Sequence, residues 1–336
     1  MYYNTSSDQC QDLLSYFSSE NKNIDILDRF SEKIAIKNRL FKYYKKAIDN
    51  DNTLYNIMNC GSFLGIDNNN KIVMANFCKN RICPVCNYRK SSIAWGKIYK
   101  SVLSHNDNYK YILITLTVRN CSPDTLNSTI DDIMYSFKRI TNRKTWKKSI
   151  LGYVRGLEIT FNESENTFHP HVHILCAVNK NYYDRPDLYI NAEELTMWWK
   201  QSARLNYRPD TDIRAVDDTK SGVAEVAKYA LKMSDILTGS TIDKTRINAL
   251  KTLYAAVFNR RLSATAGVFK NVNLDDDNLF DELELYKDDF GGDSRDTAKK
   301  FIYTTSGYID VSFKDYDYIT KESKKYQYYL KKQYNL

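Results

Sequence analysis

Apolar and polar residues alternate along several segments in the middle of the chain, as in β-strands with a buried face. Residues 110–120 (KYILITLTVRN) form one such segment, rich in β-branched side chains. Residues 152–162 (GYVRGLEITFN) and 167–178 (TFHPHVHILCAV) form two more, joined by the short polar sequence NESEN. This arrangement predicts an antiparallel hairpin. A shorter strand is expected at residues 212–218 (DIRAVDD).

Apolar residues at helical spacing occupy most of the segments around these strands. Ser122 and Pro123 stand where helices favour a cap and a first-turn proline, so a helix is expected from there to Trp146. Further helices are predicted within the first 55 residues, at residues 192–205, at residues 221–237 and beyond residue 240.

The order β-α-β-β-α-β-α predicts an α+β fold, with an antiparallel sheet and helices on one face, as in ferredoxin-like and RRM-like domains. The other regions are assigned by composition and pattern. The expected parts are a helical N-terminal region at 1–55, a cysteine-rich segment at 56–100, a sheet-containing core at 101–240, a helical extension at 241–272, an acidic linker or loop at 273–297 and a C-terminal tail at 298–336.

The charge distribution indicates a polyanionic partner. The chain has 49 lysines and arginines, 41 acidic residues and a net charge of +8. Ten of the acids lie in residues 273–297, so the remainder has 47 basic and 31 acidic residues, a net charge of about +16. This excess favours a nucleic acid, and the alternative is a solvated lysine-rich surface. The acidic segment itself could be a solvated linker, a DNA mimic or a docking site for a host helicase.

Signals for a membrane or for export are missing from the sequence. No stretch approaches the roughly 18 apolar residues of a membrane span. The first residues (MYYNTSSDQCQDLL) lack the basic and apolar regions of a signal peptide. We therefore expect a cytoplasmic protein without a membrane partner. No GxxxxGK[S/T] motif occurs, so no P-loop nucleotide site is expected.

Three of the four histidines lie within five residues, in the sequence TFHPHVHIL. Side chains two residues apart share one face of a strand, so His171 and His173 form a pair suited to a metal ion. Glu158 on the neighbouring strand can face the same side, and His169 competes with it as the third ligand. Such a set with open positions suits Mn²⁺ or Mg²⁺. The alternatives are a chance cluster and hydrogen-bonded histidines of the core.

Seven cysteines are present, and three of them lie within nine residues. The odd number and the missing secretion signal favour a metal site over disulfides. Cys78, Cys83 and Cys86 supply three thiolates, and Cys60 could complete a tetrahedral structural zinc site. The alternative is that these thiols stay reduced and pack as small apolar groups.

The predicted helix at residues 221–237 has side chains suited to phosphodiester chemistry. Glu225 and Tyr229 are four residues apart and share one helical face, with Lys228 and Lys232 on a neighbouring stripe. A phenol beside a divalent ion can attack a phosphodiester, while lysines stabilise the non-bridging oxygens. A glutamate one turn away can activate water for a later step. By itself this pattern is common, because the chain has 27 tyrosines.

Taken in order, YILITLTVRN, HPHVHIL and EVAKYALKMSD resemble the three motifs of the rolling-circle plasmid replication initiators, within the HUH endonuclease superfamily. The upstream sequence FCKNRICPVCNYRKSS is similar to the cysteine segment that precedes the first motif in the Gram-positive plasmid branch. The resemblance covers residues 56–270 and implies that residues 101–240 form an HUH endonuclease core.

The resemblance also implies roles for individual residues. Tyr229 would nick one strand at the double-strand origin, forming a covalent 5′-phosphotyrosine and a free 3′-hydroxyl primer. His171 and His173 would bind the divalent ion, and Glu225 would direct water at the junction when a round of replication ends. The expected partners are plasmid origin DNA, single-stranded or extruded as a hairpin, and a host helicase and polymerase, since the sequence lacks a P-loop; a homodimer is a further possibility.

Other functions remain open at this point. A single-tyrosine transposase or a conjugative relaxase would use the same histidine chemistry, although relaxases usually place the tyrosine ahead of the histidines. A protein of another class, a non-catalytic zinc-containing DNA-binding regulator, would need only the cysteines and the basic surface. Formation of a covalent adduct with a single-stranded oligonucleotide in Mn²⁺ distinguishes the enzymes from the regulator.

Overall fold

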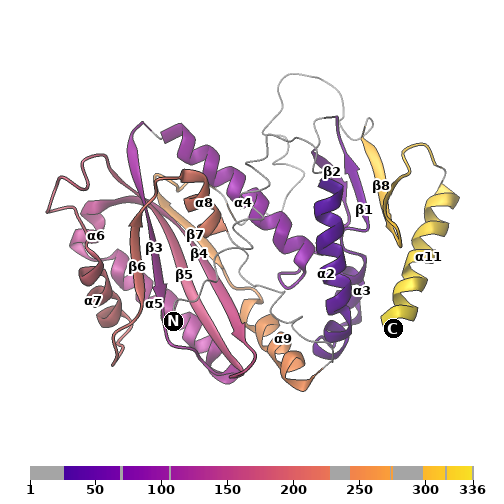
Figure 1. The fold of residues 1–336 in the computed structure, drawn as a ribbon, viewed down its shortest axis with the longest axis horizontal. Helices are drawn as coiled ribbons and strands as arrows, with labels where there is room; N and C mark the ends of the chain where they lie inside the picture. The colour runs from indigo at the N-terminus through magenta and orange to yellow at the C-terminus, as the bar shows by residue number, and fades with distance from the viewer. Residues whose placement is uncertain are drawn as a thin grey trace. The chain divides into compact units, whose positions relative to one another are not determined.

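A computed structural model of the chain describes residues 26–68, 71–105, 107–227, 243–272, 274, 298–314 and 316–334. These residues form two compact units (Figure 1). The first contains the described parts of Arg89–Asp235 and Thr252–Asp275, and the second those of Glu20–Tyr88, Ile236–Lys251 and Asp276–Leu336. None of the described helices combines the length and the apolar character that a membrane span needs. The helical pattern predicted at residues 13–19 and the acidic segment from residue 275 to 297 lie outside the described residues.

The first unit is built on a five-stranded antiparallel sheet with the strand order β6-β3-β5-β4-β7. Along the chain, a helical connection joins β3 to β4, a hairpin joins β4 to β5, and a second helical connection joins β5 to β6. In the sheet, β5 lies between β3 and β4. This is a split β-α-β arrangement. The strand bounds are β3 Tyr109–Thr117, β4 Ile150–Asn162, β5 Thr167–Asn179, β6 Thr211–Ala215 and β7 Ser263–Gly267. The predicted α+β class with an antiparallel sheet is confirmed.

The hairpin of β4 and β5 forms the middle of this sheet. Its strands pair from Ile150 opposite Val178 to Asn162 opposite Thr167, with one register shift between Ile150 and Gly152. The side chain of Asn162 accepts hydrogen bonds from Ser164 Oγ (2.8 Å) and the Glu165 amide (3.3 Å) in the turn. This polar turn fixes the pairing of the two strands, and the predicted hairpin is confirmed.

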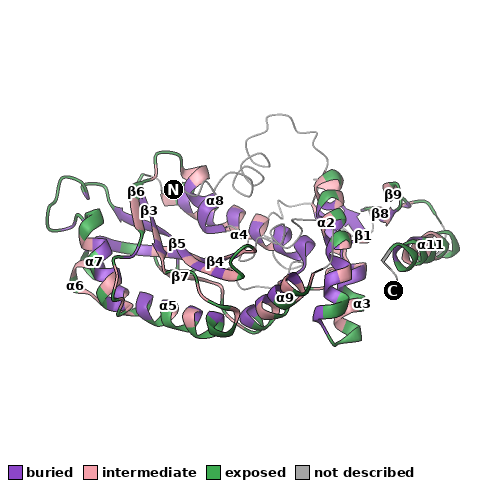
Figure 2. Ribbon diagram, turned by 60° about the horizontal axis from the view of Figure 1, so that its bottom comes forward, coloured by how far each residue is buried: buried purple, intermediate pink, exposed green. Residues whose placement is uncertain are grey.

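Helices cover both faces of the sheet, whereas the sequence analysis expected them on one face only. Figure 2 shows α5 and α8 on opposite sides of the strands. On one side, Phe137 of α5 packs edge-on against Tyr153 of β4, with ring centroids 5.3 Å apart. On the other, residues of α4 and α8 form an apolar cluster with Leu113, Leu175 and their neighbours. The bounds are α4 Pro84–His105, α5 Leu126–Thr141, α7 Ala192–Ser202 and α8 Thr219–Ala227.

The composition of β5 explains this second layer. Its residues 172–178 are all buried, so side chains on both faces of the strand are covered. After His173 both sets of alternating positions are apolar or small, with Ile174 and Cys176 on one face and Leu175 and Ala177 on the other. A strand that is apolar on both faces needs a cover on each side. The expectation of a single helical layer was therefore wrong.

The helix predicted to start at Ser122 begins later than expected. A short 3-10 turn, η1 (Pro123–Thr125), precedes α5, and the Ser122 side chain makes no capping hydrogen bond. Its hydroxyl instead lies 3.0 Å from the hydroxyl of Thr125. The segment expected to continue to Trp146 is interrupted, and its last part is the separate helix α6 (Lys144–Ser149).

The segment expected to be a helical extension contains both a helix and a strand. The helix is α9 (Lys244–Val257), and the strand is β7, which pairs with β4 along its outer edge. Gly267 in this strand has a φ of +60°, and a Cβ atom there would lie 2.0 Å from the Leu151 carbonyl oxygen. Only glycine tolerates that backbone and that approach. The sequence SATAG has no strong apolar alternation, so it gave no strand signal.

The second unit contains a four-stranded antiparallel sheet with the order β2-β1-β8-β9. The last two strands and the helix α11 come from the segment expected to be a tail, so that expectation is corrected. β1 pairs with β8 although more than two hundred residues separate them in sequence, and this long-range pairing could not be read from local pattern. The bounds are α2 Ile26–Ala47, α3 Asp51–Asn59, β1 Phe63–Ile66, β2 Ile72–Ala75, β8 Lys299–Thr304, β9 Gly307–Asp310 and α11 Tyr316–Tyr334.

Helix α8 approaches the sheet closely at Gly156, where a Cβ atom would lie 2.5 Å from the Val226 carbonyl oxygen. Gly156→Ala is therefore expected to push α8 off the sheet and to destabilise the first unit by about 1–3 kcal/mol. Thermal unfolding followed by circular dichroism measures the effect. Gly96→Ala is the control, because no atom lies within 4 Å of a Cβ there and alanine favours the helix. Equal transition temperatures for the two variants would contradict the close contact.

Candidate functional site

The histidines of β5 lie in the middle of the first unit's sheet. His169, His171 and His173 alternate with Pro170 and Val172, so their side chains project to one face. His171 pairs directly with Glu158 of β4, and the neighbouring pair is His173 with Gly156. The hairpin register therefore brings the predicted carboxylate next to the predicted histidine pair.

Glu158, His171 and His173 form a compact group of metal-ligating atoms. Glu158 Oε2 lies 3.1 Å from His171 Nε2 and 3.0 Å from His173 Nε2, and all three ligand atoms lie within 4.8 Å of one another. Neighbouring ligands around a six-coordinate ion with bonds of about 2.1 Å are about 3.0 Å apart. The donor set and its spacing therefore fit a divalent ion.

The two imidazoles keep the buried Glu158 in its anionic form. Glu158 and His173 are buried, and the side chain of His171 is 12% exposed. Burial alone would raise the pKa of Glu158, but hydrogen bonds from His171 and His173 hold that pKa well below its usual range. A buried carboxylate beside two imidazoles is a strong site for a cation.

Contacts behind the imidazoles set their orientation. The His171 ring Nδ1 lies 3.2 Å from the carbonyl oxygen of His169, a contact that orients the ring. His173 Nδ1 lies 3.1 Å from the hydroxyl of Thr115 on β3. Both rings therefore direct Nε2 toward Glu158, as hydrogen bonds to the far ring nitrogen of a ligating histidine do in metal sites.

His169 lies beside this group and outside it. Its ring centroid is 5.3 Å from that of His171. Burial and the neighbouring His171 lower the pKa of His169 to about 4. Among the described residues, the ligand group on this sheet contains Glu158, His171 and His173 and leaves His169 out. The geometry therefore favours Glu158 as the third ligand.

Glu225 of α8 reaches the same group from the helix above the strands. Its carboxylate oxygen Oε2 lies 3.9 Å from His173 Nδ1, and its side chain is buried. The missing side chain at Gly156, the pairing partner of His173, allows α8 to come this close. Tyr229, Lys228 and Lys232, which were predicted to act with Glu225, lie outside the described residues.

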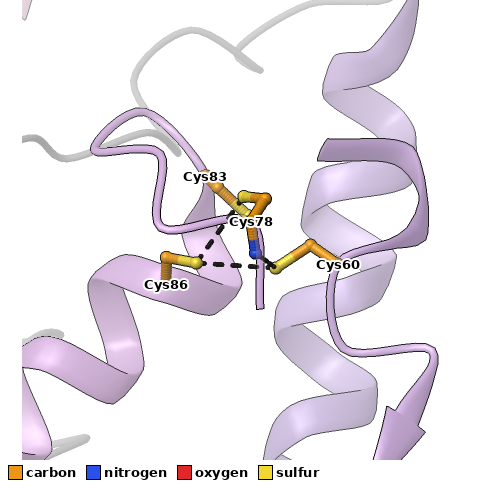
Figure 3. A group of neighbouring side chains, drawn as sticks. All are labelled: Cys60, Cys78, Cys83 and Cys86. Atoms are coloured by element: carbon orange, nitrogen blue, oxygen red, sulfur yellow. Dashed lines mark hydrogen bonds between the residues drawn. The ribbon is translucent and has the colours of Figure 1, made fainter. Parts of the chain in front are cut away.

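Four cysteines of the second unit converge at a separate position (Figure 3). Cys60 follows α3, Cys78 and Cys83 lie in the loop before α4, and Cys86 lies in the first turn of α4. Their sulfur atoms all lie within 4.8 Å of one another. The structure thus brings the predicted set together, including Cys60, the member farthest away in sequence.

The sulfur distances fit a shared metal ion. Cys86 Sγ lies 3.5 Å from Cys60 Sγ and 3.6 Å from Cys78 Sγ. A disulfide bond is about 2.05 Å long. Four thiolates about 2.3 Å from a tetrahedral zinc ion are about 3.8 Å apart, close to these values. The Cys78 amide also donates to Cys60 Sγ at 3.3 Å, as expected for a thiolate acceptor.

A buried lysine that was not predicted from the sequence lies beside this cluster. Lys37 of α2 is fully buried, and its ammonium donates to the carbonyl oxygens of Met58 (2.7 Å) and Cys60 (2.9 Å). Burial lowers the pKa of Lys37, while the nearby cysteines raise it. Lys37 lies three residues after buried Ile34, on the apolar face of α2. That spacing was the available signal.

The other two described cysteines are members of neither group. Cys176 is buried within β5, on the face opposite His173, and burial raises the pKa of its thiol. Cys121 pairs through its backbone with Phe168 just beyond the end of β3. Both are free cysteines.

The sequence profile of the family described as Replication protein matches residues 69–316, well over half of the chain. The chain belongs to the replication protein family. The matched region contains the Glu158 group, Glu225 and three of the four clustered cysteines. Membership confirms the resemblance to plasmid replication initiators that the three sequence motifs indicated.

Several proteins named Protein rep are similar to this replication protein. One from Streptococcus pneumoniae serotype 2, strain D39, is 30% identical over 70% of this chain and 75% of its own length. One from a Bacillus species is 34% identical over 60% of this chain and 72% of its own length. One from Staphylococcus aureus is 31% identical over 63% of this chain and 95% of its own length. No solved structure matches the chain significantly.

The cysteine geometry predicts the effect of removing one thiolate. If the four thiolates share a metal ion, Cys60→Ser is expected to lower the metal content of the protein sharply, because an alcohol is a poor ligand and the three remaining thiolates leave the set incomplete. Inductively coupled plasma mass spectrometry of the dialysed protein measures metal per chain and identifies the element. Cys121→Ser is the control and is expected to keep the metal. Unchanged metal content in Cys60→Ser would contradict a four-thiolate site.

Proposed function

We propose that this protein initiates rolling-circle replication of a plasmid by nicking one strand of the origin. The observation that carries the proposal is the buried group of Glu158, His171 and His173, with Glu225 3.9 Å from His173. Membership of the replication protein family supports DNA as the substrate. A protein that only bound DNA would not need a buried carboxylate between two imidazoles.

We assign the first unit to the HUH endonuclease fold. Two features support the assignment: the strand order β6-β3-β5-β4 and the position of the histidine pair on β5, between β3 and β4. The sheet supplies a rigid base for ligands, and a helix brings further groups to it. Sites built on strands and helices hold their geometry better than sites built on loops.

Glu158, His171 and His173 would hold a Mn²⁺ or Mg²⁺ ion, which when bound polarises the scissile phosphate and offsets its developing charge. Three protein ligands would leave further coordination positions open to DNA. The contacts with His169 and Thr115 orient the imidazoles so that both Nε2 atoms could bind such an ion.

Tyr229 is the proposed nucleophile. It lies four residues after Glu225, a spacing that puts both side chains on one face of a helix. Its phenol oxygen forms a bond to phosphorus while the bond from phosphorus to the 3′ oxygen breaks, and the phenol proton passes to the leaving oxygen. The products are a 5′-phosphotyrosine and a 3′-hydroxyl primer. Lys228 and Lys232 would offset negative charge on the non-bridging oxygens.

Glu225 is proposed to act at the end of a replication round. Its carboxylate is buried beside His173, where it can take a proton from a water molecule that attacks the phosphotyrosine or the new junction. A glutamate in this role releases the protein by hydrolysis, so no second tyrosine is needed. The partners would be origin DNA and a host helicase and polymerase, since the sequence lacks a P-loop.

The four cysteines are proposed to hold a structural zinc ion. Four thiolates leave no open position for a substrate, which is typical of structural sites. Buried Lys37 supports this role, because its ammonium offsets part of the negative charge of a zinc ion bound to four thiolates.

Substitution of the proposed nucleophile separates the chemical step from DNA binding. Tyr229→Phe is expected to abolish the covalent adduct with a single-stranded origin oligonucleotide in Mn²⁺ and to leave DNA binding intact, because only the attacking oxygen is lost. Denaturing gel electrophoresis measures the adduct, and fluorescence anisotropy measures binding. Tyr328→Phe, at an exposed position, is the control. An adduct formed by Tyr229→Phe would assign the chemistry to another residue.

Substitution of Glu225 separates nicking from the hydrolytic release of the protein. Glu225→Gln keeps the size of the side chain and removes its basic oxygen, so nicking is expected to continue while hydrolytic release falls by about 100-fold or more. Single-turnover assays separate the two steps by following the nick and the disappearance of the adduct. Normal release by this variant would rule out Glu225 as the water-activating group.

A further inference from the structure

A one-residue irregularity follows β3 beside the metal-ligand group. Thr117 pairs with His171, and the next backbone pairing joins Cys121 to Phe168. Four steps along one segment therefore match three along the other, as in a β-bulge. Bulges next to active sites change the direction of a side chain. The residue in the middle of this segment is Arg119, from the sequence TVRN.

Arg119 lies at the His169 end of the histidine row. The His169 ring hydrogen-bonds to the backbone of Val118, the residue before Arg119. Thr117 Oγ1 donates to the Asp210 carbonyl oxygen at 2.8 Å and so holds the loop before β6 against β3. Thr117 is the residue opposite His171. Two residues of extended chain cover about 7 Å, so Arg119 lies about that distance along the chain from Thr117.

Tyr207 from this loop fixes the position of Arg119 through two contacts. The Arg119 backbone amide donates to the Tyr207 hydroxyl at 2.9 Å. The Arg119 guanidinium lies over the Tyr207 ring, 4.0 Å from its centroid. A guanidinium stacked on an aromatic face loses little freedom and keeps the donors at its edge available.

The charge of Arg119 is not matched by a carboxylate. Arg119 is exposed, and no ion pair joins it to an acidic side chain within the described ranges. Arg208, next to Tyr207 on the same loop, differs in this respect, because its guanidinium is paired with the carboxylate of Glu193. Of the two arginines, Arg119 therefore has its donors available for an external anion.

We infer that Arg119, stacked on Tyr207, binds a phosphate of the single DNA strand next to the phosphate held at the Glu158 group. This rests on the proposed function, since it places the same strand across the same sheet. The guanidinium edge donates two hydrogen bonds to the phosphate oxygens, and the Tyr207 ring keeps that edge in place. The contact holds the strand and takes no part in bond breaking.

The test uses the full chain and a fluorescein-labelled single-stranded oligothymidylate, with anisotropy measured over a series of NaCl concentrations. Arg119→Ala is expected to weaken binding on the order of tenfold. It should also reduce the slope of log K against log salt by about 0.7, the value for one phosphate contact on a single strand. Arg119→Lys should keep the slope and recover part of the affinity. Arg208→Ala is the matched control and should behave as wild type.

A second arm uses an origin oligonucleotide with one uncharged methylphosphonate beside the cleaved bond. Wild type should lose affinity for this probe, whereas Arg119→Ala should bind it as well as the unmodified strand. An unchanged affinity and salt slope in Arg119→Ala, or equal losses in Arg119→Ala and Arg208→Ala, would overturn the inference. Absence of an adduct with wild type would instead contradict the proposed function, so the two failures are distinguishable.

Discussion

The pairing register of β4 and β5 is the constraint on which the site depends. Glu158 stands opposite His171, and the two strands pair without a break from Gly152 to the turn. A slip by one residue would turn Glu158 to the other face of the sheet. The polar turn after Asn162 and the apolar layers on both faces oppose such a slip, so the same forces that fold the sheet hold the ligands together.

Buried charge is compensated in both units, by different means. In the first unit the imidazoles of His171 and His173 stabilise the carboxylate of Glu158, and a divalent ion would do so more strongly. In the second unit Lys37 places a positive charge beside four thiols without being a ligand. Each arrangement would be costly without its partner charge, because Glu158 and Lys37 are both buried.

Local pattern was enough to predict the hairpin, the histidine face and the position of Glu158, because each follows from a period of two residues. The cysteine set was predicted from spacing alone. Pairings between distant segments were not accessible: β7 has a weak sequence signal, and β8 joins β1 across most of the chain. Two other features were visible in the pattern but were not used. The apolar residues on both faces of β5 required helices on both sides of the sheet, and the spacing of Lys37 from Ile34 placed this lysine on the buried face of α2.

The central claim is that Glu158, His171 and His173 bind one divalent ion. Anomalous scattering from crystals grown with Mn²⁺ tests it most directly. The account predicts a peak about 2.2 Å from Nε2 of both histidines and from a carboxylate oxygen of Glu158. A peak bound by His169 in place of Glu158, or no peak on this face of the sheet, would contradict it.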